Sequence, residues 1–212
     1  MVASAFGAPH VTEWVQVDVT RTMKLLERLR RDRRYQGVKL SPLTAVAQAL
    51  LVAVRRNPGI NASYDDTAGE IVTKHYVNLG IAAAAPRGLM VPVIRDAERM
   101  GLVELAEAVT ALAETARAGR TQPAEMAGGT STITNVGVFG VDGGTPIIYP
   151  GQSAILALGQ VARRPWVVKG KVRARWVTTL ALSFDHRVVD GDLGSRVLAD
   201  TAAVLEDPAT AL

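Results

Sequence analysis

The residues best suited to chemistry lie in the stretch 183–191, which reads Ser-Phe-Asp-His-Arg-Val-Val-Asp-Gly. His186 follows an apolar, β-branched run from Trp176 to Phe184 that predicts a buried strand. Asp190 comes four residues later, just before a predicted helix, and is well placed as the N-cap of that helix. A histidine at the end of a strand can face a cleft and act as a general base. The spacing fits equally well a histidine that is satisfied by its neighbours, so both interpretations stay open.

The composition predicts a single domain, residues 1–212, with one substantial hydrophobic core. Of the 212 residues, 48% are hydrophobic and 21% are charged, and no linker divides them. Because there are no cysteines, a disulfide framework, a thiolate metal site and a cysteine nucleophile are excluded. The sequence shows neither a signal peptide nor an apolar run of about 18 residues. We therefore expect a soluble, cytoplasmic protein with no membrane partner.

Basic residues are concentrated in the segment 21–39, although the net charge of the chain is only +4. The segment holds eight lysines and arginines against Glu27 and Asp32, a local charge of +6. Such a run is usually the solvated face of a helix. It could also attract the phosphates of a nucleotide cofactor or of nucleic acid. Tyr35 is the only aromatic residue among these charges, so we expect no nucleic-acid partner.

Helix and strand signals predict an α+β domain in which helices flank a mixed β-sheet. Helices are expected at 20–34, 43–55, 102–117 and 193–205, the second of them starting after the cap-and-proline pair Ser41-Pro42. Strands are expected at 11–19, 60–64, 70–73, 77–84 and 89–94, and the chain is strand-rich from residue 130 onward. Pro92 interrupts the strand at 89–94, which should therefore lie at an edge or a bulge.

Other candidate groups have weaker support. His10 is expected to make a structural contact and His75 to be exposed, and with His186 they are too dispersed for a metal site with local ligand spacing, so no metal is expected. Ser153 lies in Gly-Gln-Ser-Ala-Ile, which lacks the final glycine of a hydrolase nucleophile elbow. The glycines at 137, 140, 143 and 144 form a loop without the lysine of a P-loop.

Several motifs together resemble the catalytic domain of dihydrolipoamide acyltransferases, the core components of 2-oxo acid dehydrogenase complexes. The first is Asp-His-Arg-Val-Val-Asp-Gly at 185–191. Further landmarks occur in order at 9–12, 88–94, 130–137, 145–148 and 152–159. The resemblance covers nearly the whole chain. It implies a chloramphenicol acetyltransferase-like fold for coenzyme A-dependent acyl transfer, and a trimer.

The resemblance also implies roles for single residues. His186 would take the proton from the attacking thiol, whose pKa is ordinarily near 8.5, and return it to the leaving thiolate. Thr134 would donate a hydrogen bond to the oxyanion, and Asp190 would hold the active-site loop through an ion pair. In the family, His186 meets the Thr134 of the adjacent chain. Contacts to coenzyme A are expected at the following positions: Ser41, Thr134, Asn135, Gly159 and Val161.

The sequence departs from the family at several places. Leu26 stands where members often have an arginine, and Ala83-Ala84 where some have an aspartate; Arg28 or Lys24 could supply the missing positive charge. The segment before the first strand is shortened to residues 1–8. The lipoyl and subunit-binding domains that normally precede this domain are absent from the sequence. Those domains would carry the lipoyl group and bind the 2-oxo acid decarboxylase and dihydrolipoamide dehydrogenase components. The resemblance also implies that homotrimers of the catalytic domain gather into a 24-subunit cube.

The acyl group and some rival functions are left open by the sequence. Thr-Glu-Trp at 12–14 and Val-Asp-Val-Thr at 17–20 favour a branched-chain acyl group, whereas Thr-Asn-Val-Gly-Val-Phe-Gly at 134–140 is similar to succinyl enzymes; an acetyl-specific member is the further alternative. A chloramphenicol-type acyltransferase commonly has a second histidine where this chain has Asp185. A non-catalytic assembly core is disfavoured because His186, Thr134 and Asp190 are all present.

Overall fold

The computed structural model describes residues 1–85 and 88–211. In some strands buried and exposed residues alternate, and in others several consecutive residues are buried, as expected for apolar and β-branched segments of a sheet. The strands are β1 (His10–Asp18), β2 (Ala62–Asp65), β3 (Glu70–Thr73), β4 (Leu79–Ala85), β5 (Gly88–Met90), β6 (Val93–Ile94), β7 (Ser131–Asn135), β8 (Ala154–Leu158), β9 (Ala162–Val168) and β10 (Lys171–Asp185). The helices are α1 (Val2–Gly7), α2 (Thr20–Arg31), α3 (Pro42–Arg56), α4 (Leu102–Arg117) and α5 (Gly191–Glu206).

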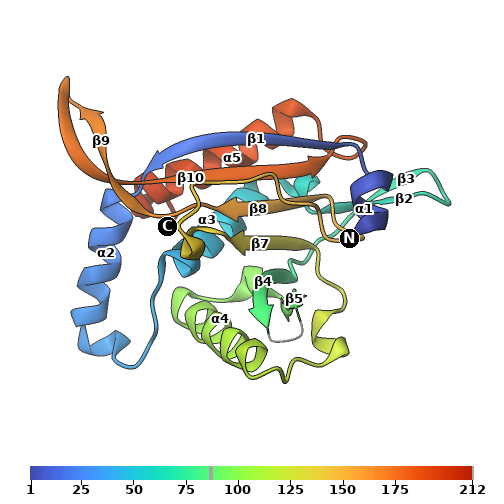
Figure 1. Cartoon of the computed structure of the whole chain (residues 1–212), viewed down its shortest axis with the longest axis horizontal. Helices are drawn as coiled ribbons and strands as arrows, with labels where there is room; N and C mark the ends of the chain where they lie inside the picture. Colours follow the sequence, from blue (N-terminus) through green and yellow to red (C-terminus); the bar gives the residue numbers. More distant parts are fainter. Residues whose placement is uncertain (86–87, 212) are drawn as a thin grey trace.

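The predicted mixed sheet is confirmed. Its order is β1-β10-β8-β7-β4-β5, with β6 paired to β4 and β9 paired to β10, while β2 and β3 form a separate hairpin (Figure 1). Strand β7 runs parallel to both β4 and β8, and the remaining pairs are antiparallel. Parallel neighbours require long crossovers, and the chain makes one between β4 and β7 through α4.

The main core lies between one face of this sheet and the helices. Alternate residues of neighbouring strands, such as Ile133 of β7, Leu156 of β8 and Leu182 of β10, are no more than 1% exposed and pack in this core. Thr132 and Thr134 of β7 point to the opposite face, where the segment 144–149 lies beside them. Because side chains alternate along a strand, one face of β7 packs in the core and the other lies beside the segment 144–149.

Close packing of α5 against β10 fixes the start of that helix. A Cβ atom added to Gly194 would lie 2.5 Å from Cε1 of Phe184, so only a glycine permits this approach. Phe184 is fully buried, and it stands two residues before His186. Its packing against α5 holds the end of β10 and the beginning of the helix together.

The structure corrects several predicted boundaries. Helix α2 ends at Arg31 rather than near residue 34, because Asp32 is extended and its carboxylate caps a separate 3₁₀ turn over Arg33–Tyr35. The strand expected at 89–94 is divided into β5 and β6 at Pro92, and it lies at the sheet edge as expected. The segment 1–8, for which no element was predicted, contains α1. Strand β10 starts five residues before Trp176, forming a projecting hairpin with β9 (Figure 1).

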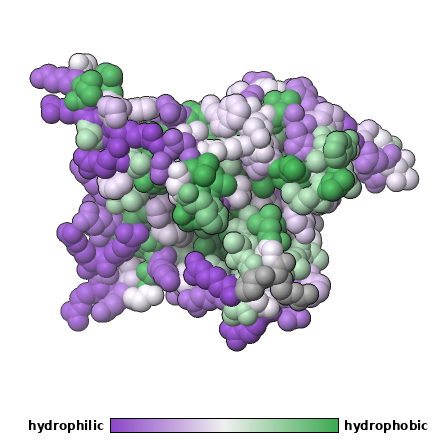
Figure 2. Space-filling model, in the orientation of Figure 1, coloured by the Kyte–Doolittle hydropathy of each residue, from purple (hydrophilic) through white to green (hydrophobic). Residues whose placement is uncertain are grey.

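Exposed apolar side chains occur on the face of the molecule that Figure 2 shows. Figure 2 shows hydrophobic residues over the middle of the face seen in Figure 1, between hydrophilic margins. The most exposed of the large hydrophobic side chains include Phe6 at 90%, Phe139 at 72% and Val138 at 70%. Contiguous exposed apolar surface commonly marks a site where another molecule binds.

Candidate active site

His186 lies in a tight turn that directly follows β10. Its side chain is exposed, and its backbone N–H donates a hydrogen bond to the carbonyl oxygen of Pro9 at 2.9 Å. The carbonyl oxygen of Asp185 accepts hydrogen bonds from the N–H groups of Val188 and Val189, both at 2.9 Å. The ring is thus exposed to solvent, whereas the backbone on either side of it is fixed by hydrogen bonds. This agrees with the prediction of a histidine leaving the end of a strand.

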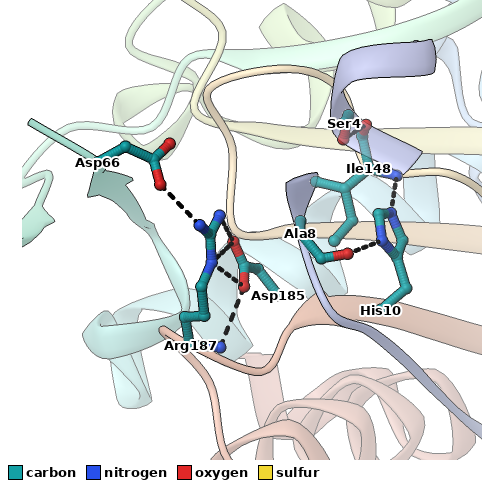
Figure 3. A network of polar contacts seen from close by, with 7 residues as sticks. All are labelled: Ser4, Ala8, His10, Asp66, Ile148, Asp185 and Arg187. Carbon is teal, nitrogen blue, oxygen red and sulfur yellow. Dashed lines mark hydrogen bonds and ion pairs between the residues drawn. The ribbon is translucent and has the colours of Figure 1, made fainter. Parts of the chain in front are cut away.

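Asp190 is the N-cap of α5. Its Oδ1 accepts a hydrogen bond from the backbone N–H of Leu193 at 2.8 Å, which satisfies one of the unpaired donors at the start of the helix. The resemblance implied an ion pair that holds the active-site loop, but no basic side chain of residues 1–85 and 88–211 pairs with Asp190. The loop is held instead by Arg187, which pairs with Asp185 (Figure 3).

Thr134 lines a cavity of about 370 Å³ on the face of the sheet opposite α3, α4 and α5. The wall of this cavity is almost entirely apolar and includes Ala82, Val91, Ile155 and Ala157. No charged side chain among the described residues lines it. A hydroxyl in such surroundings is well placed to stabilise a developing negative charge, because the local dielectric constant is low.

His186 and Thr134 of the same chain lie far apart. Thr134, Ala157 and Ala181 are register partners on adjacent strands, and His186 is five residues beyond Ala181. Two strand spacings of about 4.8 Å and five residues of about 3.3 Å each separate the two Cα atoms by roughly 19 Å. One chain alone does not bring the two residues together.

The residues expected to contact coenzyme A fall on the two faces of the sheet. Ser41, Asn135, Gly159 and Val161 line one cavity of about 400 Å³ between the sheet, the start of α3 and one side of α4. Thr134 faces the other cavity, because it precedes Asn135 on β7. Ser41 also caps α3, as predicted, by accepting a hydrogen bond from the N–H of Thr44 at 3.2 Å.

Gly159 allows the chain to cross closely at this cavity. A Cβ atom there would lie 2.0 Å from the carbonyl oxygen of Asp142, and one on Gly137 would lie 2.4 Å from the carbonyl oxygen of Gly159 itself. Thr178 donates from its hydroxyl to that same carbonyl at 3.0 Å. Larger side chains at either glycine would push the glycine-rich loop away from β8 and change the cavity wall.

Two basic residues of this cavity were not predicted as site residues. Lys39 and Arg117 line it, together with Glu114. Both cations are exposed and could approach the phosphates of a nucleotide. A single basic residue in the last turn of a helix, such as Arg117, is ordinarily explained by the helix dipole, so the sequence carried little signal for it.

The structure shows where the residues that depart from the family pattern lie. Leu26 is 2% exposed and packs with Leu40 and Ala106 in a small second core. Arg28 lines a different cavity, and Lys24 is exposed on the same helix. Neither residue is among those that line the cavity with Ser41 and Asn135. Lys39, rather than either of them, is the cation of the basic segment that reaches it.

The other histidines behave as predicted. His10 is a structural contact: its Nδ1–H donates to the carbonyl oxygen of Ala8 at 2.8 Å, and its Nε2 accepts from the N–H of Ile148 at 3.0 Å (Figure 3). His75 is exposed. Ser153 is fully buried and its hydroxyl donates to the carbonyl oxygen of Ile60, so it is not presented as a nucleophile. Within the described residues, no group of three or more potential ligands could hold a metal ion, and no helix is long and apolar enough to cross a membrane.

Comparison with known proteins identifies the family. The model of the 2-oxoacid dehydrogenases acyltransferase catalytic domain matches residues 1–212. The chain is 40% identical over 208 residues to the dihydrolipoyllysine-residue acetyltransferase component of the pyruvate dehydrogenase complex of Bacillus subtilis. This match covers 98% of the chain and 47% of the relative, so the chain spans about half the length of the curated relatives it matches. These relatives are acetyltransferases and do not support the branched-chain preference.

Solved structures give the same result. The dihydrolipoamide acetyltransferase of Azotobacter vinelandii is 31% identical with a TM-score of 0.93, and the match covers 99% of this chain and 86% of the other. The cubic core of a pyruvate dehydrogenase multienzyme complex is 31% identical, with a TM-score of 0.90 and the same coverages. A chloramphenicol acetyltransferase, 13% identical with a TM-score of 0.56 over 93% of this chain and 89% of the other, shares the fold, as predicted. The chain therefore belongs to the family of 2-oxoacid dehydrogenase acyltransferase catalytic domains.

Proposed function

We propose that the protein transfers an acetyl group from dihydrolipoamide to coenzyme A, with His186 as general base and Thr134 as oxyanion donor. The observation that carries this proposal is the grouping of Ser41, Asn135, Gly159 and Val161 in one cavity, across the sheet from Thr134. These residues are far apart in the sequence. Their convergence beside Lys39 and Arg117 suits a long ligand with a phosphorylated end.

The spacing of the reactive residues supports the same assignment. The Azotobacter structure was determined to investigate a serine, a histidine and an asparagine in the catalytic mechanism, which are separated by 52 and 4 positions. Thr134, His186 and Asp190 are separated by the same intervals. A threonine hydroxyl can replace a serine hydroxyl as a donor, and an aspartate can replace an asparagine as a helix cap.

The chemistry divides between the two residues. The imidazole of His186 removes the proton from the thiol of coenzyme A, and the thiolate attacks the carbonyl carbon of the S-acetyl group. The tetrahedral oxyanion then accepts a hydrogen bond from the hydroxyl of Thr134. When it collapses, the carbon–sulfur bond to the dihydrolipoamide sulfur breaks, and the imidazolium returns the proton to that sulfur.

The catalytic pair is completed between subunits in this proposal. The separation of roughly 19 Å between His186 and Thr134 of one chain is too large for both to contact one reacting carbonyl. The cavity at Thr134 is open and apolar, and the exposed ring of His186 from an adjacent copy could enter it. In a homotrimer with cyclic symmetry, the same contact would occur three times, so each Thr134 would meet the His186 of a neighbouring subunit.

An acetyl group fits the cavity at Thr134 better than a charged acyl group does. The side chains that line the cavity are uncharged, so none of them offers an ionic partner to the carboxylate of a succinyl group. The curated relatives are acetyltransferases of pyruvate dehydrogenase complexes. A branched-chain acyl group would also be uncharged, and we propose it only as the second substrate class.

The partners follow from the relatives. We propose that homotrimers gather into a 24-subunit cube, since one structural neighbour is the cubic core of such a complex. The full assembly would include the 2-oxo acid decarboxylase and dihydrolipoamide dehydrogenase, with lipoyl groups carried on separate domains. Coenzyme A is a substrate in this scheme, and no metal takes part.

The test is a comparison of acyl donors in the reverse direction. Acetyl-, isobutyryl- and succinyl-coenzyme A would be presented with dihydrolipoamide, and kcat/KM measured for each. We expect acetyl transfer to be fastest, and His186→Ala to lower kcat by about 10²–10⁴ because proton transfer is lost. Wild-type turnover in His186→Ala would overturn the mechanism, and a preference for succinyl-coenzyme A would overturn the substrate assignment.

A further inference from the structure

The turn that carries His186 is tied to the β2–β3 hairpin by a group of four side chains. These residues, which we call the Arg187 clamp, are Tyr64 and Asp66 of the hairpin with Asp185 and Arg187 of the turn. Figure 3 shows the guanidinium of Arg187 between the carboxylates of Asp66 and Asp185. The hairpin residues precede the turn by more than a hundred positions, so the clamp joins distant parts of the chain.

The contacts of Arg187 fix its guanidinium from several directions. Nη2 donates to Oδ2 of Asp185 at 2.7 Å, Nε donates to Oδ1 at 3.0 Å, and Nη1 donates to Oδ1 of Asp66 at 2.8 Å. The Cζ atom lies 4.4 Å from the centroid of the Tyr64 ring, a cation–π distance. The hydrogen bonds that Arg187 donates to the carboxylate of Asp185 raise the pKa of Arg187 above its ordinary value.

A second joint connects the root of the hairpin to the same turn. Ser153 on the approach to β8 accepts a hydrogen bond at its carbonyl oxygen from the N–H of Asp185 at 2.8 Å. Its hydroxyl donates to the carbonyl oxygen of Ile60, just before β2. The hairpin is therefore attached to the turn both at its root, through Ser153, and near its tip, through Arg187.

The hairpin itself contributes little to the core. All four residues of β3 are exposed, and Ile71 is 52% exposed. An element with so little buried surface gains little stability from the hydrophobic effect. Its best-defined contact outside its own root is the clamp on the turn.

We infer that Asp66 and Tyr64 are positioning residues for the general base, acting through Arg187. His186 stands between Asp185 and Arg187, the two residues that the clamp holds, so the clamp restrains the position of its Cα atom, from which the ring projects. The inference rests on the proposed function of His186. Proton transfer depends steeply on placement, and a displacement of about 1 Å can cost on the order of 10²-fold in rate.

The test uses two variants, each with a matched control from the same hairpin. Asp66→Asn removes the carboxylate that pairs with Arg187, and Glu70→Gln removes another exposed carboxylate, at the start of β3. Tyr64→Leu removes the aromatic face, and Tyr64→Phe keeps it. We expect Asp66→Asn and Tyr64→Leu each to lower kcat by about 3- to 10-fold, with the KM for coenzyme A unchanged, because the cavity at Ser41 is elsewhere.

Two further measurements separate positioning from general damage. In an Arg187→Lys background, Asp66→Asn should have little additional effect on kcat, because the shared contact is already weakened. Amide hydrogen exchange over 185–189 should be faster in Asp66→Asn than in Glu70→Gln, whether or not the protein transfers acetyl groups. Thus an inactive wild-type protein with this exchange difference would contradict the proposed function and leave the clamp supported. Equal kcat and equal exchange in variants and controls would overturn the clamp.

Discussion

His186 combines an exposed ring with a fixed backbone. Its own N–H is bonded to Pro9, and the preceding Asp185 is buried, with its side chain only 4% exposed and paired with Arg187. A buried carboxylate without a partner would be costly, so the pair strongly favours this one arrangement of the turn. The imidazole can therefore stay exposed while the mobility of its backbone is restricted.

Asp190 should act through its cap rather than through its charge. Asp190→Ala removes the hydrogen bond to Leu193, which should cost about 0.5–2 kcal/mol and lower kcat by disturbing the turn. Asp190→Asn keeps an oxygen that can accept this bond, so it should retain both the melting temperature and most of the activity. Melting curves at equal protein concentration and steady-state kinetics would check both expectations.

Asp190→Ser is the informative control, because serine caps helices about as well as aspartate. Loss of activity with unchanged stability in both Asp190→Asn and Asp190→Ser would show that the charge itself is required. That result would favour the ion pair implied by the family resemblance, formed in the assembly, over the cap seen in one chain.

At the residue scale, the sequence was most informative where the family motif was complete. The motif around His186 and the cap at Ser41 could be predicted from local patterns. Lys39 and Arg117 could not, because only the packing of α3 and α4 against the sheet brings them to the cavity with Asn135. The pairing of Asp66 with Arg187 could not be predicted either, since Asp66 is one of three consecutive polar residues in a turn and nothing local distinguishes it.

At the element scale, the junction between β1 and α2 is fastened to β10. Arg175 donates from Nε to Oδ2 of Asp18 at 2.7 Å, and Asp18 also accepts from the N–H of Thr20 at 3.0 Å. The N–H of Trp176 donates to the hydroxyl of Thr20 at 2.9 Å. The projecting hairpin of β9 and β10 thus leaves the sheet from a fixed base.

This junction should make part of the stability depend on pH. Burial alone would raise the pKa of Asp18, but the hydrogen bonds from Thr20 and Arg175 outweigh it and hold the pKa below its ordinary value. A carboxylate with a lowered folded pKa stabilises the fold above its unfolded pKa of about 3.9, and this contribution is lost as the pH falls through the folded value. Asp18→Asn should therefore be less stable than the wild type by about 1–3 kcal/mol at pH 7, with the difference shrinking below about pH 4.

Denaturant unfolding between pH 3 and 7 would measure this difference. Glu27→Gln is the matched control, because Glu27 pairs with Arg31 in an exposed i, i+4 arrangement that contributes little. A constant difference between Asp18→Asn and the wild type across the range would mean that the charge of Asp18 does not stabilise the junction.

Elements with clear end signals were the most predictable. Helix α4 begins and ends where the sequence places it, at Leu102 and Arg117, because Glu104 caps its first turn and Gly119 follows its end. Strand β9 left no clear signal, since alternate residues such as Arg164 and Trp166 lie outside the main core. Burial does alternate along β9, but Arg164 is half-buried and Val167 is exposed, so the order of apolar and polar residues does not reveal the strand.

At the scale of the whole molecule, the proposed function makes one chain incomplete as an enzyme. The cavity at Thr134 opens on the sheet face opposite α3, α4 and α5, and the apolar residues Val138 and Phe139 of the glycine-rich loop are exposed. A second copy would cover apolar surface and supply His186 in the same contact. In the proposed trimer, the assembly would provide both part of the stability and half of each active site.

Two inactive chains should then rescue each other. His186→Ala subunits keep Thr134, and Thr134→Ala subunits keep His186. In every mixed trimer, one of the three interfaces brings an intact His186 to an intact Thr134. With random, equal mixing about three quarters of the trimers are mixed, so the activity should recover to about a quarter of the wild-type value.

The experiment requires unfolding the two variants together, refolding them and measuring the masses of the resulting trimers. Refolding each variant alone gives the baseline activity of its defective sites. If His186 and Thr134 served the same site from within one chain, every site in the mixture would carry one defect. The mixture would then have only the average activity of the two separate variants, even where the masses prove that the trimers are mixed. Recovery well above that average can arise only if each site takes His186 from one chain and Thr134 from the next.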